Sequence, residues 1–214
     1  ISNVVNQAKI NAIKEEKISI NNTDLIIAID EVMIGREKPE RKMTDKELEK
    51  VAYHEAGHAV MSLLINEKEP PIKVSIVPRG ESALGFTMPK PKDVKLHSKN
   101  YLLGEVLILL SGRGAEKIFY SEYSSGSYDD IQKVTNILRT YYKSFGMSEK
   151  HGPLNYEDND QNSIKIASIN SDISEFSRYL ENLTFNILND NKENIIIIAN
   201  LLLDKKTINY REIK

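Results

Sequence analysis

The sequence predicts a mainly α-helical domain with one small β-sheet. Apolar residues recur at helical spacing over several long segments, whereas runs of strand-forming residues are few and short. A length of 214 residues suits one compact domain with a fragment of a second, and an apolar content of 40% is enough for an ordinary core. We therefore expect several helices around one core, with the small sheet beside them.

The first 43 residues are predicted to form two short helices and a linker. The helices fill residues 1–34 and are joined by the polar turn Ser19–Thr23. The second helix runs from Asp24 to about Ile34, with apolar residues at core spacing at Leu25, Ile29 and Val32. The charged stretch Gly35–Lys42 has the composition of a linker. We place the domain boundary at residues 37–43.

A long helix is predicted to begin after Thr44. Thr44 and Glu47 fit a capping box, in which each side chain bonds the backbone amide of the other residue. The helix should extend to about Asn66, with a buried stripe formed by Leu48, Val51, Ala52, Ala59 and Leu63.

Two short strands are expected next, at Lys73–Val77 and Leu84–Thr87. Val74 and Ile76 alternate along the first strand. This pattern fits an edge strand that pairs with an extended polypeptide, and it fits equally well a strand buried within a small sheet.

The second half of the chain is predicted to be almost entirely helical. Ser121–Ser127 is rich in Ser and Gly, and residues 151–163 are polar, so both segments are expected to be loops. The predicted helices are Tyr101–Tyr120, Asp129–Phe145, Ser171–Asn189, Lys192–Leu203 and a last helix that begins near Thr207.

Composition excludes several classes of function. A net charge of −2 and an isoelectric point near 6.2 give no electrostatic attraction to nucleic acid or to an anionic membrane. With no cysteine, a metal ion would need His and carboxylate ligands. The most apolar runs, Leu102–Leu110 and Ile195–Leu203, are shorter than the ~20 residues of a transmembrane helix. Because the chain starts with Ile1, we expect a fragment whose membrane anchor, if any, lies outside it.

His54, Glu55 and His58 form the most informative motif of the chain. Residues four apart on a helix lie on one face, so both imidazoles can bind the same metal ion. Glu55 can then take a proton from a water on that ion. This His-Glu-x-x-His spacing is the zincin signature, and it predicts a zinc site in the middle of the long helix.

The third zinc ligand does not follow from this motif. Metzincins have Gly and His where this chain has Met61 and Leu64, so that subclass is excluded. Asp130 is the strongest candidate because it lies in the first turn of a helix after a Gly- and Ser-rich loop. In the competing interpretation, Asp129 or Asp130 only interacts favourably with the helix dipole and binds no metal. The remaining candidates are a carboxylate of the preceding helix and two histidines interpreted as surface residues: Glu116, His97 and His151.

Several further motifs resemble, in order and spacing, the peptidase domain (M41) of the FtsH family. These proteins are membrane-anchored, ATP-dependent zinc proteases of bacteria, mitochondria and plastids. The resemblance covers residues 44–214, and residues 1–36 resemble the last helices of the family's AAA+ lid. It is carried by Ala52–Val60, Val77–Gly80, Leu84–Thr87, Ser111–Glu116, Ser125–Ile131 and Leu203–Ile208.

The resemblance implies a helical zincin-type peptidase domain whose sheet lies next to the active-site helix. It implies zinc bound by His54, His58 and Asp130, with Glu55 as the catalytic base. The family commonly has Asn at the position of Asp129. Two interpretations of Glu116 remain: it orients one of the ligand histidines, or it is a solvated carboxylate on the surface of its helix. The resemblance also favours the edge-strand interpretation of the first predicted strand.

For the whole protein, the resemblance implies a homo-hexamer that degrades unfolded or membrane proteins. ATP and Mg²⁺ would bind only in the missing AAA+ module, since the Walker motifs are absent. The membrane would be the bacterial or mitochondrial inner membrane, or a plastid membrane, and only segments outside this fragment would contact it. No nucleic-acid partner is expected. The alternatives are an inactive, hexamer-assembling scaffold and a chaperone-like domain without metal. The intact histidine motif argues against the scaffold.

Overall fold

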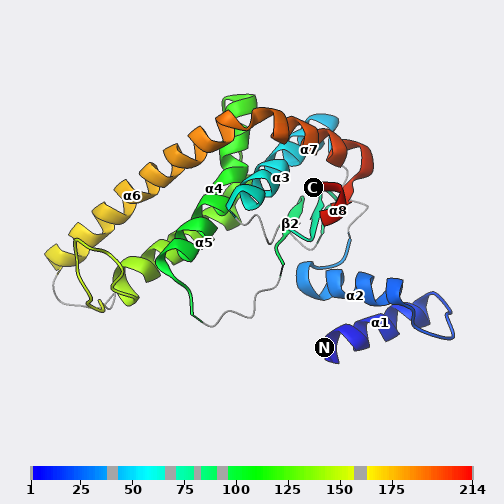
Figure 1. The fold of residues 1–214 in the computed structure, drawn as a ribbon. Helices are drawn as coiled ribbons and strands as arrows, with labels where there is room; N and C mark the ends of the chain where they lie inside the picture. The colour runs from blue at the N-terminus through cyan, green and yellow to red at the C-terminus, as the bar shows by residue number, and fades with distance from the viewer. Residues whose placement is uncertain are drawn as a thin grey trace.

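A computed structural model of the chain describes residues 2–37, 43–65, 71–79, 83–90, 96–156 and 163–213. These residues form a mainly helical structure with one small antiparallel sheet, which confirms the predicted fold class (Figure 1). None of the described helices is both long and apolar enough to cross a membrane. The elements are α1 (Ser2–Lys14), α2 (Asn22–Ile34), α3 (Asp45–Ile65), β1 (Lys73–Ser75), β2 (Phe86–Met88), α4 (Lys99–Tyr120), the 3₁₀ turn η1 (Ser125–Ser127), α5 (Tyr128–Arg139), the π-helical turn η2 (Thr140–Ser144), α6 (Ser163–Asp190), α7 (Lys192–Lys205), β3 (Thr207–Asn209) and α8 (Tyr210–Ile213).

The long helix α3 begins where the sequence predicts, because Thr44 and Glu47 form the capping box. The Thr44 amide donates to Glu47 Oε2 at 2.8 Å, and the Glu47 amide donates to Thr44 Oγ1 at 3.3 Å. The helix continues to Ile65, the last described residue of this segment. Its predicted end, Asn66, lies outside the described residues.

The core is built around α3, which packs against both α4 and α7 (Figure 1). The contact with α4 is closest at Gly57, where an added Cβ would lie 2.6 Å from Ser111 O and 2.8 Å from Ala115 Cβ. Only glycine permits two helices to approach so closely at this point. The approach places the middle of α3, with His54 and His58, directly against α4.

The sheet has the strand order β2-β1-β3, and both pairs are antiparallel. Val74 of β1 lies opposite Thr87 on one side and Ile208 on the other. β1 is therefore the central strand, and the edge position considered for Lys73–Val77 is wrong. The helix predicted to begin near Thr207 is also wrong, because this segment is β3 and only the short α8 follows it. Ile208 is fully buried in the core, but three residues are too short a pattern to indicate a strand.

Two helices of the second half differ from the prediction. α5 ends at Arg139 and continues as the π-helical η2, where one regular helix to Phe145 is predicted. α6 begins at Ser163 and not at Ser171. Its additional turns carry two apolar residues at helical spacing that pack into the protein: Ile166 and Ile169. Residues 157–162 of the predicted loop lie outside the described residues.

The two helices predicted in residues 1–34 are present as α1 and α2, and they pack against each other as a hairpin (Figure 1). α2 begins two residues earlier than expected because Asn21 and Asp24 form a capping box. Of the three residues expected at core positions, Leu25 is half-buried, but Ile29 and Val32 are exposed. The expectation fails because the core face of α2 is centred on Ala28, which is fully buried.

An ionic contact joins the hairpin to the sheet. Asp30 of α2 is paired with Lys73 of β1, and its Oδ2 lies 3.6 Å from Nη2 of Arg79. Arg79 also pairs with Glu37, beyond the end of α2. Most of the predicted linker, residues 38–42, lies outside the described residues.

Candidate metal centre

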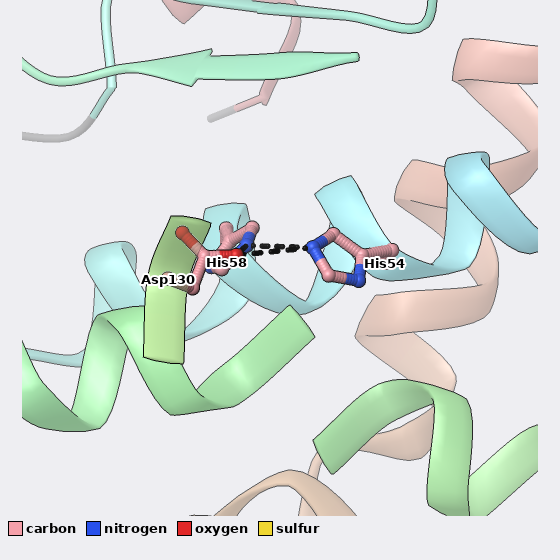
Figure 2. A group of neighbouring side chains, drawn as sticks. All are labelled: His54, His58 and Asp130. Carbon is pink, nitrogen blue, oxygen red and sulfur yellow. Dashed lines mark hydrogen bonds and ion pairs between the residues drawn. The ribbon is translucent and has the colours of Figure 1, made fainter. Parts of the chain in front are cut away.

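Three side chains from two helices meet at one point beside α4 (Figure 2). His54 and His58 extend from the same face of α3, and their Nε2 atoms are 3.1 Å apart. Asp130, in the first turn of α5, has its Oδ2 atom 3.4 Å from His54 Nε2 and 3.3 Å from His58 Nε2. Two ligands of a tetrahedral zinc ion, each about 2.0 Å from the metal, are about 3.3 Å apart. The three atoms therefore fit three corners of a zinc site.

Hydrogen bonds on the far side of each imidazole fix which nitrogen is free. Nδ1 of His54 lies 2.7 Å from Glu116 Oε1, and Nδ1 of His58 lies 2.7 Å from the Ile108 carbonyl oxygen. Both partners are acceptors, so each Nδ1 carries a hydrogen, and Nε2 is the nitrogen of each ring that faces the site and can bind a metal ion. Glu116 is held in turn by the Ser124 amide, which donates to its Oε2 at 2.6 Å. Glu116 is thus buried against His54 and is not a solvated carboxylate.

Space for an ion is left by a glycine of α4. A Cβ atom added to Gly112 would lie 2.4 Å from His54 Nε2 and 2.6 Å from His58 Nε2. Any side chain at this position would clash with the two Nε2 atoms that face the site. The sequence shows Gly112 only as part of a motif, because its role depends on how α3 and α4 pack.

The charges around the site favour a bound cation. Burial disfavours the charged form of His54, but hydrogen bonds to Asp130 and Glu116 outweigh burial and raise its pKa to about 10. Burial would also raise the pKa of each carboxyl group, yet contacts with the histidines hold the pKa of Asp130 and of Glu116 below the ordinary value. Two ionised carboxylates inside a protein need a positive partner, which an imidazolium or a metal ion provides.

Glu55 lies between the two histidines in sequence and contacts β2 instead of the ligand cluster. Its side chain is buried, and Thr87 Oγ1 donates to its Oε2 at 2.8 Å. Burial is the largest influence on this carboxyl group and raises its pKa above the ordinary value. Glu55 adjoins His54 in the chain but is not part of the cluster, so its carboxyl group is available for proton transfer.

The other predicted candidates do not join the cluster. Asp129 is exposed, although it is the neighbour of Asp130. His97 is exposed as well, and His151 Nε2 lies 2.6 Å from Asp172 Oδ2. Within the described part of the chain, the group of His, Asp and Glu side chains with metal-binding geometry is that of His54, His58 and Asp130.

Comparisons with known proteins match the whole chain. The sequence model of Peptidase family M41 matches residues 41–214. The ATP-dependent zinc metalloprotease FtsH of Bacillus subtilis is 35% identical over 230 residues, covering 100% of this chain and 36% of the relative. FtsH of Leptotrichia buccalis is 34% identical over 222 residues, covering 100% of this chain and 29% of the relative. FtsH of Methylococcus capsulatus is 41% identical over 157 residues, covering 73% of this chain and 25% of the relative. The matched part of the chain spans between a quarter and about a third of the length of these relatives.

These matches confirm the resemblance stated from the motifs. The matched region contains α3, the loop before α5 and the strands of the sheet, which are the elements that surround the cluster. The chain therefore belongs to peptidase family M41, the metalloprotease family of the FtsH proteins.

Proposed function

We propose that this chain is the zinc-dependent endopeptidase domain of a membrane-anchored, ATP-dependent protease that degrades unfolded or membrane proteins. The main support is the triangle of His54 Nε2, His58 Nε2 and Asp130 Oδ2, which has the dimensions of a zinc site, with Glu55 beside it. The names of the relatives, ATP-dependent zinc metalloprotease FtsH, agree with this function.

In this proposal His54, His58 and Asp130 hold zinc, and Glu55 moves protons. Two neutral imidazoles and one carboxylate leave a Zn²⁺ site with a net positive charge, so zinc supplies Lewis-acid activation of water and of the peptide carbonyl. Glu55 accepts the proton of the attacking water and later donates a proton to the nitrogen of the leaving amine. The reaction requires no nucleophilic side chain, so Ser111, Ser125 and Ser127 have structural roles.

The substrate would bind in an extended conformation along β2. This strand has β1 on one side, and in the sheet order β2-β1-β3 its other edge has no strand partner among the described residues. Thr87 of β2 contacts Glu55, so a peptide added to that edge would pass close to the site. The edge strand expected from the sequence is thus replaced in our proposal by β2.

For the whole protein we infer a homo-hexamer with an AAA+ module that contains residues 1–36 as the end of its lid. ATP and Mg²⁺ would bind to that module, and a segment outside this chain would anchor the protein in a bacterial or mitochondrial inner membrane or a plastid membrane. Several apolar side chains of α1 and α2 are exposed in this chain, and the rest of the AAA+ module would cover them: Ile10, Ile13, Ile26, Ile29, Val32 and Met33. An inactive scaffold is the less favoured alternative because Glu55 and all three ligands are present.

Cleavage of unfolded casein by the purified protein tests this function. We expect cleavage that a chelator abolishes, that added zinc restores, and that Glu55→Gln lacks although it retains zinc. Cleavage that is insensitive to the chelator, or full activity of Glu55→Gln, would contradict the proposal.

A further inference from the structure

Thr87, on the edge strand β2, contacts the carboxylate of Glu55 directly. Its hydroxyl lies 2.8 Å from Glu55 Oε2 and 3.4 Å from the Glu55 carbonyl oxygen. A hydroxyl has one proton to donate, so the shorter contact is the main hydrogen bond. This bond engages Oε2 of the carboxylate and not Oε1.

Gly85, two residues earlier in the same segment, limits the carboxylate from another direction. A Cβ atom at Gly85 would lie 2.8 Å from Glu55 Oε1 and 2.9 Å from Glu55 Cγ. The backbone of Gly85 is therefore in close contact with the part of Glu55 that Thr87 does not bind. Together the two residues restrict the Glu55 side chain to one orientation.

The position of Thr87 is fixed by the sheet and the core. Thr87 lies opposite Val74 in the register of β1 and β2, and Val74 is fully buried in the core cluster that also contains Ala52, Ala56 and Ala59 of α3. A shift of β2 relative to α3 would disturb this packing. The hydroxyl is therefore held in place by the same core that positions the two ligand histidines.

We propose that Thr87 is a positioning residue for the peptidase reaction. Its hydroxyl holds the Glu55 carboxylate in the one orientation in which it takes a proton from the attacking water and returns it to the leaving amine. The proton of Thr87 stays on its own oxygen throughout, so Thr87 orients the base without exchanging protons. This inference rests on the proposed function.

A comparison of Thr87→Val with Thr87→Ser tests the role of the hydroxyl. Val preserves the shape and the branched Cβ of Thr but removes the hydroxyl, whereas Ser keeps the hydroxyl. With an unstructured fluorogenic peptide, we expect Thr87→Val to lower kcat by about ten- to a hundredfold with little change in KM, because orientation of the base is lost. Thr87→Ser should retain most of the kcat of the wild type, and both variants should bind one zinc ion per chain.

Thr207→Val is the matched control. Thr207 lies on β3, the opposite edge of the sheet, and its Oγ1 is 2.7 Å from Ser75 Oγ. Its replacement also removes one hydrogen-bonded hydroxyl from the sheet, but far from Glu55 in the strand order, so kcat should not change. Thr87→Ala replaces Thr87→Val in the comparison if the valine variant does not fold.

The outcomes separate this inference from the proposed function. Equal kcat for the wild type and Thr87→Val, with Glu55→Gln inactive, would overturn the role of Thr87 alone. Equal losses in Thr87→Val and Thr87→Ser would also overturn it, because packing and not the hydroxyl would then matter. Full activity of Glu55→Gln would instead contradict the proposed function.

Discussion

The two histidines of the proposed zinc site are oriented by different partners. His54 is oriented by the buried carboxylate of Glu116, whereas His58 is oriented by the carbonyl of Ile108. Both partners belong to α4, so the same helix that packs against α3 at Gly57 also orients the imidazoles. A change in the distance between α3 and α4 would therefore alter packing and metal geometry together.

Gly112→Ala should prevent zinc binding although every ligand is present. The added methyl group would lie within 2.6 Å of both Nε2 atoms and occupy the space that the ion requires. We expect zinc content to fall from one ion per chain to near zero, measured by elemental analysis of the dialysed protein. The control is Gly104→Ala in the same helix, where the nearest contact of the added Cβ is Ile65 Cγ2 at 3.0 Å.

Circular dichroism would establish that both alanine variants keep their helical content. A fully helical Gly112→Ala protein that binds one zinc ion with unchanged affinity would contradict the assigned site.

Zinc affinity should fall as the pH is lowered. The carboxylates of Asp130 and Glu116 raise the pKa of His54 to about 10 in the metal-free protein, so His54 is protonated at pH 7. Zinc must displace this proton, and the affinity should therefore rise about tenfold per pH unit between pH 7 and 9. Competition with a chelator of known pH dependence measures the slope, and an affinity that is constant over this range would contradict the assignment.

The sequence predicts the three residues that the structure brings together, His54, His58 and Asp130, but not the contacts that support them. His54, Glu55 and His58 lie within one helical turn, so their relation is local and readable from spacing. The roles of Gly112 and Thr87 depend on contacts between elements far apart in the chain. No local pattern contains that information.

At the scale of elements, the contact between α2 and the sheet depends on a buried carboxylate. The side chain of Asp30 is 7% exposed and lies between Lys73 and Arg79, whose side chains are 18% and 6% exposed. Removal of the carboxylate would leave two largely buried cations without this partner. Such a loss is costly because the remaining charges are poorly solvated.

Asp30→Asn should lower the free energy of unfolding by about 1–3 kcal/mol. Urea denaturation followed by circular dichroism measures the change. The control is Asp190→Asn, an exposed carboxylate at the end of α6, which should change stability by no more than about 0.5 kcal/mol. Equal stability of the two variants would show that the ion pairs of Asp30 do not hold the hairpin to the sheet.

The sequence predicts long helices and helices with a capping motif better than it predicts short elements. α3 and α4 are long, periodic and apolar, and Thr44 marks the first of them by its capping box. β3 was missed because it has three residues and pairs with β1, more than 120 residues earlier. The first turns of α6 were missed because Ser and Asn separate its isoleucines, and their burial depends on the packing of α6 against η2.

At the scale of the whole molecule, the proposed peptidase site can cut only a chain that reaches it in an extended form. In our proposal the force to unfold a substrate comes from the AAA+ module, and the sequence of this chain contains no Walker motif. We therefore expect residues 1–214 to degrade loosely folded polypeptide without ATP and to leave stably folded protein intact. The test compares one tightly folded substrate with a destabilised variant of the same protein, and equal degradation of both would contradict this expectation.

The central claim is that one zinc ion is bound by His54, His58 and Asp130. Anomalous diffraction from crystals of the zinc-loaded protein, recorded above and below the zinc absorption edge, tests it most directly. We expect one strong peak per chain, about 2 Å from His54 Nε2, His58 Nε2 and an Asp130 carboxylate oxygen. A peak coordinated by Asp129 in place of Asp130, or no peak between the two histidines, would contradict it.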